Sequence, residues 1–139
     1  MILRTLSVLA LAVALSVAGA IAQEPDTKAP RAAVDAWLSL IDEAKYAQSW
    51  DEAGTAFKGA VTSETWQNAV KSARGRFGAF KSRTLKSAMP ATKLPNAPDG
   101  EYVVFQFDAI YEQNAATAEL VTAAREKDGS WRVVGYFIK

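Results

Sequence analysis

The chain of 139 residues contains no histidine and no cysteine. Without an imidazole or a thiol it has no Ser-His-Asp or Cys-His catalytic group, no His or Cys ligand for zinc, haem or an iron–sulfur cluster, and no disulfide. The net charge is also close to zero, since the chain has 16 basic and 15 acidic residues. Half of the residues are apolar, which excludes a disordered chain, and the length suits one domain. Any chemistry must come from carboxylates, Lys, Arg, Tyr, Ser and Thr.

Residues 1–22 have the pattern of a secretory signal peptide. Arg4 gives the positive start, residues 6–17 form the apolar run, and small residues end the segment. We expect cleavage after Ala22, a periplasmic or secreted location, and equal numbers of acidic and basic side chains in residues 23–139. The apolar run is shorter than the ~20 residues of a spanning helix. We therefore expect no membrane-spanning segment in the mature chain, the alternative being a retained anchor.

Helical periodicity dominates the first half of the mature chain. A polar leader over residues 23–29 is expected to be disordered, and a single domain to follow over residues 30–139. Pro30 suits a first helical residue, and the helix it starts is expected to run to about Ala44. Its apolar stripe is Val34, Trp37, Leu38 and Ile41.

Two further helices are expected before the pattern changes. Ser49 and Glu52 have capping-box spacing, which predicts a helix that starts at Ser49 and buries Ala53 and Phe57. Thr62 or Ser63 is expected to cap a third helix that ends at Gly78. The buried seam of this third helix is predicted to be Trp66, Val70, Ala73 and Phe77.

The second half indicates strands. Residues 80–86 predict a first strand, residues 88–100 a loop, and residues 102–112 the clearest strand, because its apolar residues alternate. Residues 116–126 and 131–138 flank a hairpin turn. Helices followed by an antiparallel meander predict an α+β fold, with the N-terminal helices packed on a curved antiparallel sheet. We expect the core to join the helical stripes to Val103, Phe105 and Phe107.

Residues spread over the whole mature chain resemble a known family, the bacterial domain of unknown function 4019. The most specific element is the final Asp-Gly-x-Trp-Arg-Val-x-Gly-Tyr, which starts at Asp128, and similar hairpins occur in cystatin-like cone folds of the ketosteroid-isomerase and nuclear-transport-factor-2 type. The resemblance implies an exported bacterial protein with a cone-like sheet, and it implies no activity or catalytic residue. The other residues that carry it are Trp37, Leu38, Asp42, Tyr46, Ser49, Trp50, Trp66, Arg76, Gly78, Arg83, Glu119 and residues 98–102.

Carboxylate and tyrosine pairs are the candidate catalytic groups. In a cone fold, a carboxylate beside a tyrosine can act as a general base with an oxyanion donor. Asp108 shares a strand face with Tyr102, and Glu119 and Tyr136 are the other candidates. In the alternation of side chains along its strand, Asp108 takes a position that faces solvent, and we expect its replacement by Asn to leave activity intact. Glu119 interrupts an apolar strand, and a buried charge there should be paired. Its candidate partners are Arg76, Arg83 and Arg132.

One segment is strongly basic. Seven basic residues and no acidic one lie between Glu64 and Asp99. Such a stripe can bind an acidic partner or ligand, or it can be a solvated face. The candidate binding residues are Arg74, Arg76, Lys81, Arg83 and Lys86.

We expect no nucleic-acid partner, no metal and no cofactor, because base-reading motifs, EF-hand spacing and glycine-rich phosphate loops are missing from the sequence. The four Trp residues form either a core or a ligand pocket. Tyr102, Val104 and Ile110 leave the outer sheet face partly apolar, which predicts a possible homodimer.

The leading functional prediction is an exported, non-enzymatic binding or interaction module in the bacterial envelope, for a protein or small ligand that the sequence does not identify. One alternative is a small acid/base enzyme that uses a carboxylate and a tyrosine. The other is a structural or assembly protein that acts through the outer sheet face.

Overall fold

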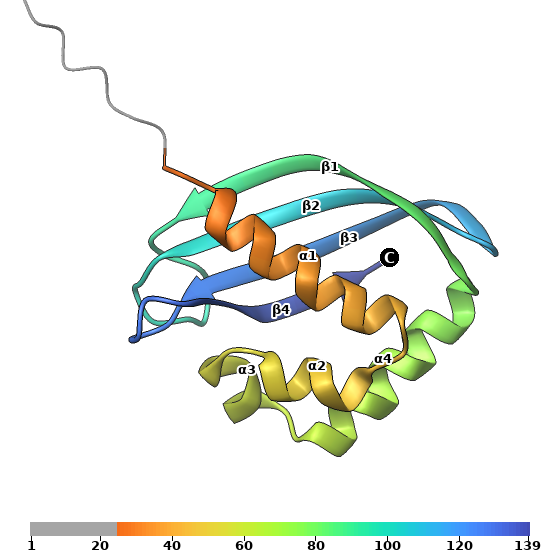
Figure 1. Ribbon diagram of the computed structural model, residues 1–139, viewed down its shortest axis with the longest axis horizontal. Helices are drawn as coiled ribbons and strands as arrows, with labels where there is room; N and C mark the ends of the chain where they lie inside the picture. The colour runs from red at the N-terminus through yellow and green to blue at the C-terminus, as the bar shows by residue number, and fades with distance from the viewer. Residues whose placement is uncertain (1–24) are drawn as a thin grey trace, which may run out of the picture.

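The computed structural model describes residues 25–139. The expected signal peptide and the first two residues of the expected leader lie outside this range. Four helices precede four strands, and the strands form one antiparallel sheet in the order β1-β2-β3-β4. The helices lie on one face of the curved sheet, with α1 running across it (Figure 1). The predicted α+β class is confirmed. Within residues 25–139, no helix has both the length and the apolarity to cross a membrane.

Helix α1 spans Lys28–Asp42 and buries the predicted stripe of Val34, Trp37, Leu38 and Ile41. It begins two residues before Pro30, because Asp26 Oδ1 accepts a hydrogen bond from the Lys28 backbone N–H at 2.9 Å. It ends earlier than expected because Ala44 adopts a φ of 59°, which turns the chain out of the helix.

The prediction that a helix starts at Ser49 is wrong. Ser49 lies inside α2 (Tyr46–Glu52), and a separate short helix, α3 (Thr55–Ala60), follows. Ser49 is fully buried and connects three helices. Its carbonyl accepts from Trp37 Nε1 at 2.8 Å, and its hydroxyl accepts from Trp66 Nε1 at 2.9 Å. The capping-box spacing was misleading because these tertiary bonds determine the role of the serine.

Helix α4 spans Ser63–Phe77 and has the predicted ends. The Thr62 hydroxyl caps it by accepting from the Thr65 backbone N–H at 3.2 Å, and Gly78 ends it with a φ of 76°. Only glycine adopts that conformation without strain. The buried residues of α4 are Trp66, Val70 and Arg74, so the seam passes through Arg74 where the sequence predicted Ala73.

The sheet follows the predicted strands with one correction. Strand β1 (Phe80–Ala91) continues through residues 88–91, which were predicted to be loop, and it tolerates Pro90 because it is an edge strand. Strand β2 spans Tyr102–Tyr111. Strands β3 (Asn114–Arg125) and β4 (Trp131–Ile138) form the predicted final hairpin.

The core lies between the helices and the sheet, as predicted. Phe105 and Phe107 are fully buried, and Val103 is nearly so. They belong to one core cluster with helical residues that include Trp37, Ile41, Trp66 and Val70. Trp37 lies between Phe57, Trp66 and Tyr136, so the tryptophans of α1 and α4 are core residues.

We expect Phe105→Ala to lower the free energy of unfolding by ~3–5 kcal/mol, because it leaves a cavity in a core that cannot collapse freely. Urea denaturation measures the change. Ile110→Ala on the same strand is the matched control, since Ile110 is 46% exposed. A loss below ~1 kcal/mol for Phe105→Ala would contradict the assignment.

Candidate functional site

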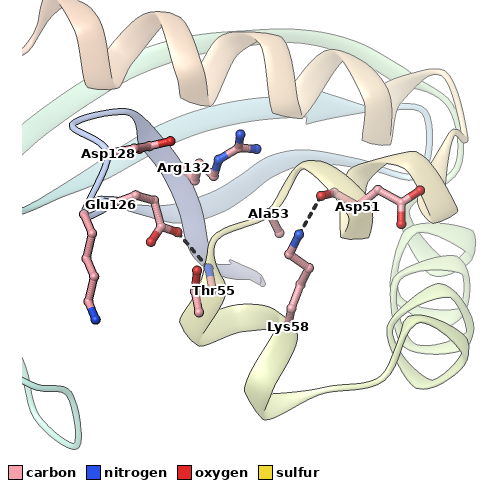
Figure 2. Close-up of a pocket in the computed structure, with 8 residues that line it drawn as sticks. Asp51, Ala53, Thr55, Lys58, Glu126, Asp128 and Arg132 are labelled. Atoms are coloured by element: carbon pink, nitrogen blue, oxygen red, sulfur yellow. Dashed lines mark hydrogen bonds between the residues drawn. The ribbon is translucent and has the colours of Figure 1, made fainter.

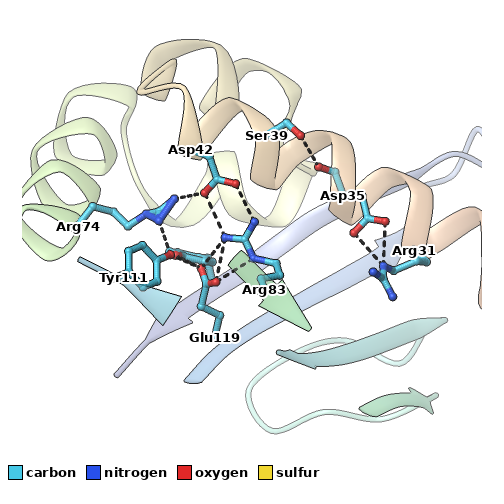
Figure 3. Close-up of polar contacts among 9 residues, drawn as sticks. Arg31, Asp35, Ser39, Asp42, Arg74, Arg83, Tyr111 and Glu119 are labelled. Atoms are coloured by element: carbon cyan, nitrogen blue, oxygen red, sulfur yellow. Dashed lines mark hydrogen bonds and ion pairs between the residues drawn. The ribbon is translucent and has the colours of Figure 1, made fainter. Parts of the chain in front are cut away.

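Six polar side chains meet between the helices and the sheet in what we call the charge cluster (Figure 3). Each comes from a different element, namely α1, α4 and the four strands. The two guanidinium and two carboxylate groups balance in charge. The members are Asp42, Arg74, Arg83, Tyr111, Glu119 and Tyr136.

Glu119 is the centre of the charge cluster and is fully buried. Oε1 accepts from Arg83 Nε at 2.9 Å, and Oε2 accepts from Tyr136 at 2.6 Å, from Tyr111 at 3.0 Å and from Arg83 Nη2 at 3.2 Å. The predicted pairing of Glu119 with an arginine is therefore confirmed, and Arg83 is that partner. Arg132 instead donates to the Glu52 carbonyl at 3.1 Å.

Arg74 and Asp42 complete the charge cluster on the helical side. Arg74 donates to Tyr111 and to Asp42, and Asp42 also binds Arg83 Nη1 at 2.7 Å. Sequence reasoning missed this part of the cluster. A usable signal was present, since Arg74 lies four residues after buried Val70 and so belongs to the same helical face. Arg74 Nε is the one buried side-chain polar atom of residues 25–139 without a partner.

The charge cluster is built for structure more than for proton transfer. Burial raises the pKa of the Tyr136 and Tyr111 hydroxyls, and the negative charge of Glu119 raises it further, so both remain protonated donors. Glu119 already accepts four hydrogen bonds and is closed to solvent. A general base needs a free lone pair within reach of a substrate proton.

The structure does not bring the other catalytic candidates together. Asp108 is exposed on the outer sheet face, where its register partners are Thr84 and Ala118. Tyr102 lies six residues away along β2, about 20 Å at 3.3 Å per residue, and its hydroxyl donates to the Pro98 carbonyl. Of the four candidates, only Glu119 and Tyr136 are in contact.

The basic segment divides between interior and surface. Arg74 and Arg83 are used in the charge cluster, whereas Arg76, Lys81 and Lys86 are exposed. The five candidate binding residues therefore do not form one surface. In the part of the chain that the structure describes, no group of three or more carboxylates is placed to hold a metal ion.

A polar hollow of about 490 Å³ lies between α3 and the β3–β4 turn (Figure 2). Glu126 accepts from the Thr55 backbone N–H at 2.7 Å, and Lys58 donates to the Asp51 carbonyl at 2.9 Å. Asp128 bonds its own turn through Ser130. Most of the charged groups that line this hollow already bind other groups of the protein. Their contacts hold α3 against the hairpin and leave few groups to bind a ligand.

A second and larger hollow, the terminal groove, has a volume of about 740 Å³. It lies where β1 and β3 end, β2 and β4 begin, and α1 starts. Its walls are mostly apolar, and its rim carries the Arg125–Glu101 ion pair at 3.0 Å. The lining residues are Pro25, Asp26, Ala29, Pro90, Ala91, Thr92, Glu101, Tyr102, Val103, Arg125 and Trp131.

Trp131, in the wall of the terminal groove, differs from the other three tryptophans. The indole N–H groups of Trp37, Trp50 and Trp66 all donate to protein oxygens at 2.8–2.9 Å. The Trp131 indole has no such partner among residues 25–139, and the side chain also lines an adjoining hollow of about 450 Å³. A half-buried aromatic ring with a free donor is a typical contact for a ligand.

Comparison with known proteins gives a family without an assigned activity. A family model described as "Protein of unknown function (DUF4019)" matches residues 33–136, which confirms the expected resemblance. The matched range contains the whole charge cluster and Trp131. A search of curated proteins finds no matching relative.

We expect Tyr136→Phe to lower the free energy of unfolding at pH 8 by ~1.5–3 kcal/mol, the typical contribution of a hydrogen bond to a charged group. The difference from the wild type should shrink above pH 10. The pKa of Tyr136 is raised in the folded state. Its contribution to stability is therefore complete below ~10, the pKa of the tyrosine in the unfolded chain, and is lost as the pH rises above that value.

Denaturation of both proteins from pH 8 to about pH 11.5 measures this difference, in which the other titrating groups cancel. A difference that stays constant or grows with pH would contradict the burial and bonding of Tyr136.

Proposed function

The chain belongs to the DUF4019 family of proteins of unknown function, and we propose that it is an exported, non-enzymatic binding module of the bacterial envelope. Its ligand site is the terminal groove. The observation that carries this proposal is the groove itself, which is about 740 Å³ and mostly apolar. Its wall contains the Trp131 indole, which has no hydrogen-bond acceptor in the described part of the chain. Ligand sites in proteins commonly have this volume and this mixture of an apolar lining with a few polar groups.

The charge cluster supports binding over catalysis. In the enzyme alternative, a carboxylate and a tyrosine act on a substrate, and Glu119 is in contact with two tyrosines, Tyr111 and Tyr136. None of these three residues lines the terminal groove, and Glu119 is fully buried. The groove contains the carboxylates of Asp26 and Glu101, of which Glu101 is paired with Arg125.

The chemistry of the terminal groove favours a small amphipathic ligand. Ala29, Pro90 and the Trp131 ring offer apolar surface, which suits an aliphatic or aromatic body. The Trp131 N–H is a donor, and Arg125 at the rim is a cation with half of its side chain exposed. A ligand with one acceptor or anionic group at the end of an apolar body would match both features.

We expect the arylsulfonate probe 1-anilinonaphthalene-8-sulfonate to bind the terminal groove, with a rise in its fluorescence and energy transfer from Trp131. Ala29→Phe should weaken binding at least about tenfold, because the added ring occupies the groove. Fluorescence titration measures the affinity.

Ala32→Phe is the matched control, since it makes the same change on an exposed position of α1 outside the groove lining. Asp108→Asn is a second control on the far face of the sheet and should also leave binding unchanged. Absence of probe binding, or equal loss in Ala29→Phe and Ala32→Phe, would contradict the proposed site.

Export rests on the sequence of residues 1–22. We expect protein recovered from its native host to begin at Gln23, which intact mass spectrometry will show. Replacing both Ala20 and Ala22 by Leu removes the small residues that signal peptidase requires and should leave the segment attached. A wild-type mass that includes residues 1–22 would indicate a retained anchor.

A further inference from the structure

The middle of the outer face of the sheet, on the side away from the helices, has no charged side chain. Side chains alternate between the two faces of a strand, so the register identifies the outward rows. Two central rows cross all four strands. One is Met89, Val104, Thr122 and Gly135, and the other is Ser87, Gln106, Leu120 and Phe137.

These rows expose large apolar side chains. Met89 is 63% exposed and Phe137 is 59% exposed, and both lie on edge strands. The two central rows contain no ionisable residue, and Asp108 and Lys139 lie one row further along, toward the β2–β3 turn. Depletion of charge around exposed aromatic and Met side chains is typical of the centre of a protein interface.

Side-chain size is arranged so that each row is large at one edge and small at the other. Met89 on β1 shares its row with Gly135 on β4, and Phe137 on β4 shares its row with Ser87 on β1. Gly135 has no side chain on this face, and a Cβ placed there would make an ordinary contact with Thr122 at 3.5 Å, so a larger residue at this position would extend outward from the sheet. Each bulky residue therefore has a small counterpart on the opposite edge of its own sheet.

We propose that this face binds a second copy of the chain, about a two-fold axis that runs parallel to the strands between β2 and β3. Such an axis keeps each row in place and lays β1 over β4 of the second copy. Met89 then packs over Gly135 of the other copy, and Phe137 over Ser87. An isologous interface must be complementary to itself, and this pattern of sizes satisfies that condition.

The size of the face agrees with a stable dimer. Four strands at ~4.8 Å spacing and about ten residues at ~3.3 Å give roughly 600 Å² of flat area, to which protruding side chains add. A standard interface buries about 800 Å² of accessible surface per partner. Packed sheets in proteins align within about 30° at ~10 Å separation, which accommodates these side chains.

Sedimentation velocity from about 1 to about 200 µM tests the proposal, on wild type and variants purified in the same way and verified by intact mass. We expect the wild type to reach dimer mass within this range. Phe137→Ser, Met89→Ser and Gly135→Met should each weaken association about 30-fold or more, because each one removes or blocks a packing contact between a large and a small side chain across the interface.

The decisive variants exchange sizes between the two edges. Met89→Gly combined with Gly135→Met should recover association to within about fivefold of the wild type, as should Phe137→Ser with Ser87→Phe. The exchanged residues lie on opposite edges of one sheet and do not touch within a chain, so recovery requires a second copy. Gly75→Met, at an open position on α4, is the matched control and should change nothing.

Thermal unfolding is recorded for every variant, and Met89→Ser and Phe137→Ser keep the test valid if Gly135→Met fails to fold. A wild type that remains monomeric at about 200 µM would overturn the proposal. A dimer that is insensitive to the single variants, or that the exchanges fail to restore, would overturn it equally, because association would then use another surface or another axis.

Discussion

The buried charge of Glu119 is the constraint on which the rest of the structure depends. A carboxylate without solvent must be compensated, and removal of one partner from a buried ion pair typically costs ~3–5 kcal/mol. Arg83 and two tyrosines supply that compensation, and Asp42 in turn pairs with both Arg83 and Arg74. Since the cluster takes one residue from α1, from α4 and from each strand, it fixes the helical layer over the sheet and selects the strand register.

The same cluster determines where a ligand can bind. A sheet covered by helices on one side often encloses a pocket, but here that space is taken by the charge cluster and by aromatic side chains such as Trp37 and Tyr136. The surface that remains available for binding therefore lies at the ends of the sheet and on its outer face. The terminal groove lies at the end where the Trp131 indole has no acceptor within the described residues 25–139, although the other three tryptophans have one.

Sequence patterns predicted the parts of the fold that depend on local periodicity. The α1 stripe, the Thr62 and Gly78 helix ends, and the alternation of β2 are each determined by neighbours a few residues apart. Ser49 and Arg74 were misassigned because their roles depend on partners 12 to 37 residues away. The terminal groove was beyond prediction for the same reason, since five separate segments form it. Glu119 was the exception, because a lone charge in an apolar strand already implies a buried partner.

The proposed dimer and the terminal groove constrain each other through the symmetry axis. An axis parallel to the strands preserves the row order, so the sheet ends that carry Trp131 lie at the same end of both copies. An axis perpendicular to the strands would place the two grooves at opposite ends. Two grooves at the same end allow two amphipathic groups carried by one ligand to bind together, and the second contact then benefits from a high effective concentration. Weak binding at each groove would then be sufficient, which agrees with a mostly apolar site whose proposed contacts to a polar group are the Trp131 N–H and the partly exposed Arg125.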